Sequence, residues 1–497
     1  MRDSTQRSID LLDMVLDRAR SLSQVAAVDD TDGECSYEEL RCLACQVAET
    51  IRSSTENPCP RILVALPPSR RAYAAMVGSL IAGGTFCPVD LHGPEGRNEG
   101  ICGAFAPNVV LFEKSAPSFL SVLPVTTPKI DLLKQLAKDE SSPSAECSDV
   151  AYVVFTSGST GQPKGVKMGR RGFSHFLGIA MDYFSLSAGE RWGQFSNLGH
   201  DLGVMDVFMA LTQGGTLVPL TEAERRLRPA EAVRDKRLAV WQSVPSVLEF
   251  MIRAEQLTSE YLSSLRVMSF CGDALHAHQL EALFKARPDL NVFNTYGTTE
   301  TTGFNTINRL TSTTFRNSCD AGAVAIGDDV PGWKIHLHGG DDDNEGQIVV
   351  ASEFLSLGYW RDEERTRNAF RQVEFAGSAA ERCYFTGDWG VRRGGRLYCT
   401  GRMDRQVKIR GERIELEEID GLLREAGFAA AYTIVKDSDL YAFVESTQPI
   451  DTEEIRSHLQ HSLPFQAIPR DIYALPSLPR NQNGKIDRET LLQQVRQ

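Results

Sequence analysis

A run of small hydroxyl and glycine residues, TSGSTGQPKG at residues 156–165, is the strongest chemical signal in the sequence. Backbone N–H groups and hydroxyl donors of such a run can approach phosphate oxygens closely, and Lys164 adds a positive charge. The spacing differs from that of a Walker A loop. A plain surface loop is the alternative, but the run directly follows the apolar segment AYVVF at residues 151–155. This position favours a phosphate-binding loop at the end of a strand.

Two polar segments further along the chain contain groups suited to binding a nucleotide. The segment NTYGTTETT, residues 294–302, offers a tyrosine ring that can stack on a base and Glu300, a carboxylate that can hold Mg²⁺ beside phosphates. The segment YFTGD, residues 384–388, ends in Asp388, which can accept two ribose hydroxyls after a tight turn. Taken alone, each segment is more commonly a solvated turn.

Two basic segments lie near the C-terminus. GRMDRQVKIRG occupies residues 401–411, and NGKIDR occupies residues 483–488 and contains Lys485. A lysine on an exposed loop is normally solvated surface, so neither segment defines a site by itself.

The elements that must position these groups alternate between strands and helices. Residues 61–111 have the pattern of strand, helix and strand, and residues 206–220 that of a helix, a Gly-Gly stop and a strand. LAVWQSVP, LRVMSFCG and LNVFNTYG each indicate a strand that runs into a polar or glycine-rich turn. The pattern predicts an α/β fold with parallel-type sheets, whose ligands bind beyond the carboxyl ends of the strands.

The sequence changes character after about Arg402. QVKIRGERI predicts a short hairpin, and an amphipathic helix and further strands follow it. We expect a large N-terminal domain over residues 1–403 and a small α+β domain over residues 404–497, which contains Lys485.

Composition limits the classes of function. The length of 497 residues suggests about three domain-sized units. The chain has 53 Lys and Arg against 66 Asp and Glu, a net charge of −13, which argues against a general nucleic-acid binder. Its 11 cysteines show no disulfide or zinc pattern, and neither a signal peptide nor a membrane span is apparent. We expect a cytoplasmic protein.

In their order and separation, the five segments resemble the adenylate-forming superfamily. That superfamily comprises acyl- and aryl-CoA synthetases, firefly luciferase and the adenylation domains of nonribosomal peptide synthetases. The resemblance extends from SYEEL at residues 36–40 to Lys485. Members join a carboxylic acid to ATP as an acyl-adenylate, release pyrophosphate and pass the acyl group to a thiol. The resemblance therefore implies ATP and Mg²⁺ as cofactors.

The resemblance also implies roles for individual residues. Lys485 would bridge the substrate carboxylate and the α-phosphate, Glu300 would serve Mg²⁺, and Thr156 would complete the catalytic set. Asp404 matches the hinge, about which the small domain swings so that Lys485 leaves and residues 406–411 enter for transfer. The implied ATP site consists of Thr156, Ser157, Gly158, Ser159, Thr160, Gly161, Lys164, Asn294, Thr295, Tyr296, Gly297, Thr298, Thr299, Asp388, Arg402 and Lys485.

Asp201 is the implied selector of substrate. In amino-acid-activating members an aspartate at this place pairs with the substrate ammonium, whereas the alternative is a helix N-cap. The nearest resemblance is to stand-alone D-alanine–carrier-protein ligases, on DLGVMD at residues 201–206, GGTL at 214–217 and FCG at 270–272. The implied substrate pocket consists of His200, Asp201, Met205, Gln242, Ser269, Cys271, Thr295, Gly303, Phe304 and Lys485.

Departures from the pattern leave three hypotheses open. His200 replaces the phenylalanine usual in amino-acid activators, Thr298 replaces a proline, and Gly303 replaces a β-branched residue. The first hypothesis is a ligase that loads a small, alanine-like amino acid onto a phosphopantetheinylated carrier protein, for example in natural-product synthesis. The carrier would act in trans, because only 12 residues follow Lys485. The others are an acyl- or aryl-CoA synthetase and a nucleotide-binding regulator that has lost catalysis.

Overall fold

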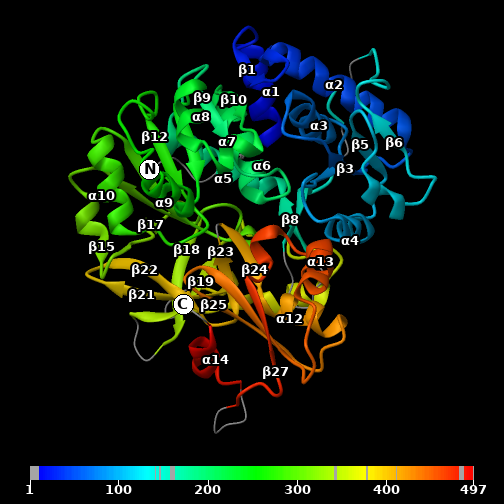
Figure 1. The fold of residues 1–497 in the computed structure, drawn as a ribbon. Coiled ribbons are helices and arrows are strands. Elements are labelled where there is room, and N and C mark those ends of the chain that lie inside the picture. The colour runs from blue at the N-terminus through cyan, green and yellow to red at the C-terminus, as the bar shows by residue number, and fades with distance from the viewer. Residues whose placement is uncertain are drawn as a thin grey trace.

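The computed structural model describes residues 10–139, 142–144, 147–156, 163–340, 344–375, 379–409, 411–480 and 486–495. Two large sheets, a smaller antiparallel sheet and a group of C-terminal elements make up the fold (Figure 1). The predicted α/β class is confirmed. Among the described residues, no helix has the length and apolar character needed to cross a membrane.

The first large sheet has six strands in the order β6-β5-β3-β4-β7-β8. Its strands pair in parallel, except that β8 runs antiparallel to β7. The strands are β3 (Arg61–Ala65), β4 (Thr85–Pro88), β5 (Val109–Phe112), β6 (Lys129–Asp131), β7 (Val150–Thr156) and β8 (Lys164–Gly169). β6 lies within the long connection between β5 and β7.

The second large sheet has nine strands in the order β17-β14-β13-β12-β11-β9-β10-β1-β2. The run from β13 to β1 is parallel, and β2, β14 and β17 pair antiparallel at the edges. The strands are β1 (Ala26–Asp30), β2 (Gly33–Ser36), β9 (Arg191–Gln194), β10 (Thr216–Pro219), β11 (Val240–Ser243), β12 (Val267–Phe270), β13 (Asn291–Tyr296), β14 (Thr306–Leu310) and β17 (Asp328–Asp329).

Helices α5 (Arg170–Phe184) and α6 (Asp201–Gln213) lie between the two large sheets (Figure 1). The ring of Phe208 on α6 lies 6.1 Å from Phe86 of the first sheet and 5.7 Å from Phe173 on α5. Residues 203–213 of α6 are all buried, as expected of a helix that is apolar all round. The helix ends at Gly214, whose φ of +86° is the left-handed conformation that favours glycine as a C-cap.

The remaining helices of the large N-terminal part cover the sheets. They are α1 (Leu11–Ser21), α2 (Tyr37–Ser54), α3 (Arg70–Ile81), α4 (Glu95–Phe105), α7 (Glu222–Arg226), α8 (Pro229–Asp235), α9 (Pro245–Arg253) and α10 (Ala277–Ala286). A capping box formed by Ser36 and Glu39 sets the start of α2.

An antiparallel sheet follows the two large sheets in the chain. It consists of β18 (Lys334–Gly339), β19 (Glu345–Ala351), β20 (Phe370–Val373), β21 (Glu381–Arg393) and β22 (Arg396–Arg402), with α11 (Glu363–Ala369) before β20. Asp388 lies inside β21, so the tight turn predicted at residues 384–388 is wrong. Gly387 alone has a positive φ there, +79°, and the ladder shifts register at Trp389.

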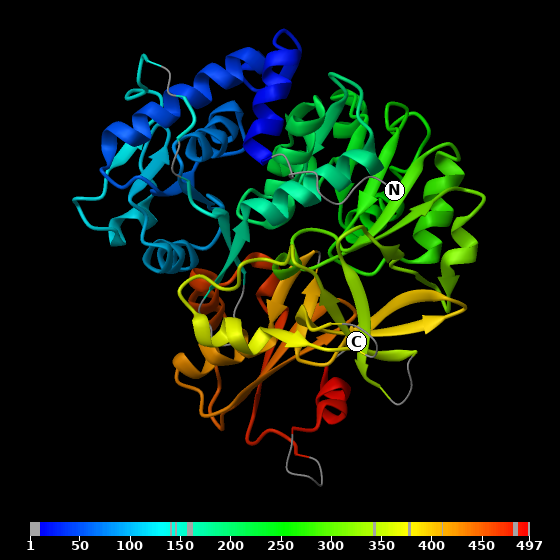
Figure 2. The same ribbon diagram turned by 180° about the vertical axis from the view of Figure 1, so that it is seen from behind.

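The C-terminal elements have a hydrophobic core of their own, which includes Ile419, Leu423, Ala442 and Leu459. They lie together against one side of the rest of the molecule, coloured orange to red in Figure 1 and seen from behind in Figure 2. They are the hairpin β23 (Gln406–Ile409) and β24 (Glu412–Glu415), α12 (Leu416–Glu425), β25 (Ala431–Lys436), β26 (Asp439–Glu445), α13 (Thr452–Ser462), β27 (Asp471–Leu475) and α14 (Arg488–Gln494).

Candidate active site

The carboxyl ends of the parallel strands meet one another beneath the C-terminal hairpin. Thr156 ends β7, Tyr296 ends β13, and Cys271 directly follows β12. β7 pairs antiparallel with β8, which begins at Lys164, so the predicted phosphate loop lies between these two strands in the chain. Ser157, Gly158, Ser159, Thr160, Gly161 and Lys485 were predicted site residues, and all six lie outside the described residues.

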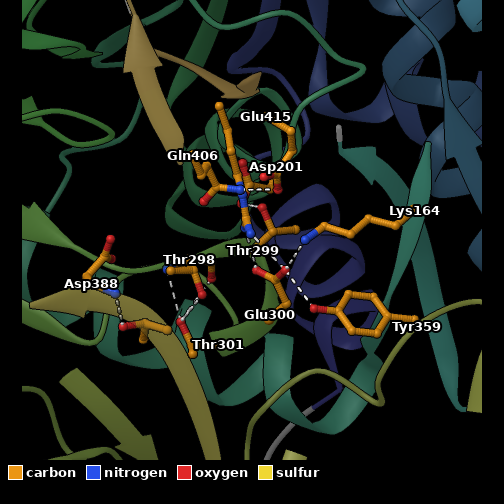
Figure 3. A network of polar contacts seen from close by, with 12 residues as sticks. Lys164, Asp201, Thr298, Thr299, Glu300, Thr301, Tyr359, Asp388, Gln406 and Glu415 are labelled. Carbon is orange, nitrogen blue, oxygen red and sulfur yellow. Dashed lines mark hydrogen bonds and ion pairs between the residues drawn. The ribbon is translucent and has the colours of Figure 1, made fainter. Parts of the chain in front are cut away.

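Glu300 is the centre of a charged cluster (Figure 3). Its carboxylate is fully buried and lies 3.3 Å from Lys164 Nζ and 3.0 Å from Arg413 Nη1. The Tyr359 hydroxyl donates to the same carboxylate at 3.0 Å. Burial by itself raises the pKa of Glu300, but Arg413 and Lys164 lower it well below its ordinary value. Glu300 is therefore an anion held by two cations.

Arg413 belongs to β24 and Tyr359 to the segment before α11, and the sequence analysis missed both. Arg413 stands within the predicted hairpin QVKIRGERI, where no local pattern separates a site residue from an outward-facing strand residue. Tyr359 has no sequence signal at all. Both reach Glu300 only through contacts between distant parts of the chain.

Asp388 holds a second polar cluster. Its carboxylate accepts a hydrogen bond from the Tyr296 hydroxyl at 2.7 Å and another from Arg402 Nη1 at 2.7 Å. Asp388 and Arg402 are opposite one another on β21 and β22, which explains the contact between them. Arg402 also donates to Asp404, at 2.7 Å and 2.6 Å. The predicted residues Tyr296, Asp388, Arg402 and Asp404 are thus brought together.

Asp201 is the first residue of α6, and His200 is its N-cap. The Asp201 carboxylate accepts a hydrogen bond from the Leu202 N–H at 2.8 Å and another from the Thr299 hydroxyl at 2.7 Å. Since Thr299 neighbours Glu300, the carboxylate of Asp201 lies beside the charged cluster. His200 Nε2 lies 3.4 Å from Glu412 of β24.

Other predicted pocket residues are buried. Met205 and Phe304 are almost fully buried, and Cys271 is buried as well. The Gln242 side-chain amide and the Ser269 hydroxyl have no hydrogen-bond partner among the described residues. Unsatisfied buried polar groups are uncommon in folded proteins, but neither side chain lines the cavity described below.

Local structure explains the residue types at Gly297, Thr298 and Gly303. Gly303 has a φ of +80°, and a Cβ there would lie 2.5 Å from the ring of Phe176. The backbone N–H of Thr298 donates to the Thr301 hydroxyl at 3.0 Å, a bond that the more usual proline lacks. A Cβ at Gly297 would lie 1.9 Å from the Gly303 carbonyl oxygen, so the chain is too close there for any side chain.

The remaining predicted nucleotide residues are held by the backbone of neighbouring segments. The Asn294 side chain donates to the Ala325 carbonyl at 3.0 Å, and the Thr295 hydroxyl donates to the Phe270 carbonyl at 2.9 Å. Both are buried at the end of β13.

A cavity of about 1080 Å³ lies between the N-terminal and the C-terminal elements. Thr156, His200, Asp201 and Thr299 line it on the N-terminal side, and the C-terminal elements line the other side. The cavity is thus lined by the carboxylate of Asp201, the hydroxyls of Thr156 and Thr299, and Arg413, which contacts the buried Glu300. Such a site is suited to binding a zwitterion beside a phosphate ester.

Residues 17–360 match the family model described as AMP-binding enzyme. The chain belongs to the AMP-binding enzymes. A D-alanine–D-alanyl carrier protein ligase of Listeria monocytogenes serotype 4a (strain HCC23) is 31% identical over 449 residues, which cover 85% of this chain and 86% of the relative. The corresponding ligase of Staphylococcus aureus (strain MRSA252) is 28% identical, and the match covers 95% of this chain and 96% of the relative.

Solved structures of AMP-binding enzymes share the fold. The Vibrio cholerae adenylation domain AlmE, solved with glycyl-adenosine-5′-phosphate, has a TM-score of 0.84 at 24% identity, covering 100% of this chain and 99% of AlmE. PA1221, a nonribosomal peptide synthetase protein with adenylation and carrier domains, has a TM-score of 0.83 at 23% identity; the match covers 98% of this chain and 84% of PA1221. The predicted adenylate-forming superfamily is confirmed, and the chain is an AMP-forming ligase of this family.

Proposed function

We propose that this ligase activates a small, alanine-like amino acid of D or L configuration as its adenylate and transfers it to the phosphopantetheine thiol of a separate carrier protein. The position of Asp201 carries this proposal. Its carboxylate lines the cavity and lies 2.7 Å from Thr299, the neighbour of Glu300. It can accept a charge-assisted hydrogen bond from a substrate ammonium, and a plain carboxylic acid has no such donor. The similarity to D-alanine–carrier protein ligases supports the same substrate class.

In the first half-reaction a carboxylate attacks an α-phosphate that is already anionic, so preplaced cations and donors supply most of the help. We assign the phosphates to residues 156–164, with Lys164 as the cation that the structure describes. We assign the ribose hydroxyls to Asp388, which Tyr296 and Arg402 orient. Lys485 is the proposed catalytic cation at the reacting carboxylate.

The residues at Glu300 fit one Mg²⁺ ion that is shared with a nucleotide. Mg²⁺ commonly takes one or two protein carboxylates and completes its shell with phosphates and waters. In the ranges that the structure describes, no group of three or more His, Cys, Asp or Glu could hold a metal by itself. When bound, the ion would neutralise phosphate charge. Arg413 contacts both oxygens of Glu300, at 3.2 Å and 3.0 Å, so it must withdraw to make room for the ion.

We further propose that the arrangement described here is the one used for transfer to the thiol. The C-terminal hairpin lies over the site: Lys408 Nζ is 5.9 Å from the centre of the Tyr296 ring, and Arg413 contacts Glu300. The domain boundary that we propose follows residue 403, with Asp404 as the hinge. Its carboxylate accepts hydrogen bonds from Arg402 and from the backbone N–H of Gln406, on either side of that boundary.

ATP–pyrophosphate exchange tests the proposal. We would assay glycine, both enantiomers of alanine, serine, proline, β-alanine, 3-aminobutyrate and plain acids such as propionate and benzoate. A positive substrate would then be offered two acceptors, phosphopantetheinylated carrier proteins and free CoA. Exchange with a small amino acid and loading of a carrier support the proposal. Exchange with plain acids alone, followed by a CoA thioester, would instead identify an acyl-CoA synthetase.

A further inference from the structure

Helix α13 of the C-terminal elements lies against helix α4 of the N-terminal part (Figure 1, and from behind in Figure 2). The two helices approach closely at Gly96, in the first turn of α4. A Cβ at this residue would lie 2.8 Å from both Cδ2 and Nε2 of His461 and 3.0 Å from its carbonyl oxygen. Non-bonded carbon atoms are normally at least ~3.5 Å apart. Any side chain at residue 96 would therefore push His461 away.

The helix itself does not explain a glycine at residue 96. Helix α4 contains Gly96, Gly100 and Gly103, although glycine is a poor helix former, and none of the three has a positive φ. A Cβ at Gly100 would make only an ordinary contact, 3.7 Å from Pro163, and a Cβ at Gly103 would meet nothing within 4 Å. Of the three glycines, Gly96 is the one at which close packing requires the absence of a side chain.

The two helix ends that meet here carry opposite partial charges. Gly96 is the second residue of α4, whose N-cap, Pro94, makes no side-chain hydrogen bond to the first turn. His461 is the next-to-last residue of α13. The N–H groups of a first turn and the carbonyl groups of a last turn have no partner within their own helices. They carry partial positive and negative charge, respectively, so their approach is favourable. The glycine permits that approach.

The contact between Gly96 and His461 lies beside the cavity and not in its wall. Their neighbours Arg97 and Leu463 line the cavity from its two sides, but neither Gly96 nor His461 lines it. The contact that the C-terminal hairpin makes through Arg413, in contrast, involves a group at the charged cluster. A substitution at Gly96 can therefore change how the C-terminal elements lie without removing a group that lines the cavity.

We propose that Gly96 and His461 form a docking contact that holds the C-terminal elements in the arrangement used for transfer to the thiol. This inference rests on the proposed function, which assigns the present arrangement to transfer. Both are positioning residues, because they act through the placement of the hairpin β23–β24. A side chain at residue 96 lowers the share of molecules in this arrangement and slows transfer. Adenylate formation, which uses another arrangement in the proposed hinge motion, is spared.

The first test compares Gly96→Leu with wild type in ATP–pyrophosphate exchange and in single-turnover transfer of the activated amino acid to free pantetheine. Overpacking at a close contact predicts a fall of roughly fivefold to a hundredfold in the rate of transfer. The exchange rate should stay within about twofold of wild type, since no group that binds ligand is changed. Gly103→Leu is the matched control: it makes the same change in the same helix, where a Cβ meets nothing, and should leave both rates unchanged.

A second pair of variants tests whether His461 is the group that a side chain would meet. Gly96→Ala should slow transfer less than Gly96→Leu does. Adding His461→Ala to Gly96→Ala removes the ring and should restore part of the lost rate. Transfer by Gly96→Leu at the wild-type rate would overturn the inference, and so would equal loss of exchange and transfer. A loss in Gly96→Ala that His461→Ala leaves unchanged would also overturn it.

Hydrogen–deuterium exchange of the whole protein without substrate tests the contact independently of activity. Peptides from the first turn of α4 and the last turn of α13 should take up deuterium faster in Gly96→Leu than in wild type or Gly103→Leu. Unchanged uptake in both peptides would overturn the inference. If wild type shows no ATP–pyrophosphate exchange with any acid, the proposed function fails, while the deuterium comparison still decides whether Gly96 and His461 hold the C-terminal elements in place.

Discussion

Replacing Asp201 with Asn removes a charge and almost nothing else. The asparagine oxygen can still accept from the Leu202 N–H, a bond of 2.8 Å at the start of α6. The free energy of unfolding should therefore change by less than about 1 kcal/mol, the usual value of a helix-start contact. A substrate ammonium, in contrast, would lose its only proposed anion. Truncating one partner of a buried charge pair costs about 2–5 kcal/mol.

That loss corresponds to a fall in kcat/KM of roughly thirtyfold to several thousandfold for an amino acid. The assay is ATP–pyrophosphate exchange with alanine against propionate, which lacks the ammonium, with chemical denaturation as a measure of stability. Alanine exchange should collapse while propionate exchange, however weak, should not fall. Thr299→Val, which removes the hydroxyl 2.7 Å from Asp201, is the control for loss of the neighbouring bond alone.

The reasoning would be refuted if Asp201→Asn exchanged alanine within about threefold of wild type while its unfolding free energy fell by more than about 1 kcal/mol. Asp201 would then serve the helix and not the substrate.

Arg413→Gln should slow transfer of the acyl group to the thiol about tenfold or more, because a charged hydrogen bond to Glu300 is lost. ATP–pyrophosphate exchange should be preserved, because Arg413 reaches Glu300 only with the hairpin in place. Equal loss in both assays would contradict this. Burial raises the pKa of Asp206 to about 8. In the folded protein its carboxyl therefore stays protonated, whereas in the unfolded chain it loses its proton above about pH 4. Wild type should lose stability relative to Asp206→Asn between pH 5 and 8, as measured by urea unfolding at each pH. Gly303→Ala should destabilise by roughly 1–3 kcal/mol, because its Cβ would meet the Phe176 ring at 2.5 Å; an unchanged urea midpoint would show that the ring moves aside.

Local patterns predicted the elements that run from an apolar stretch into a polar turn. The strands at residues 240–243, 267–270 and 291–296 are confirmed, as is the hairpin at residues 406–415. Each has a short apolar run with a clear end, and this is enough to identify a strand from sequence. Asp388 was recognised as a site candidate, but the turn assigned to it was wrong, because one glycine with positive φ inside a long strand resembles a turn locally.

Contacts between distant segments were beyond local patterns. Arg413 lies 113 positions from Glu300, and Tyr359 lies 59 positions from it. Neither spacing leaves any periodic trace. The packing of the C-terminal hairpin brings Arg413 to Glu300, and Tyr359 reaches it from the segment before α11.

The first residue of helix α6 is the residue proposed to select the substrate, whereas the rest of the helix lies in the centre of the hydrophobic core. Asp201 begins it, and residues 203–213 are wholly buried between the two large sheets. Met205, four residues on, is 2% exposed and belongs to the main core. Substitutions that enlarge the pocket at Met205 therefore also disturb packing, whereas His200 and Asp201 can vary without that penalty. Laboratory evolution toward other amino acids should accept changes at His200 early, and changes at Met205 only after stabilising mutations elsewhere.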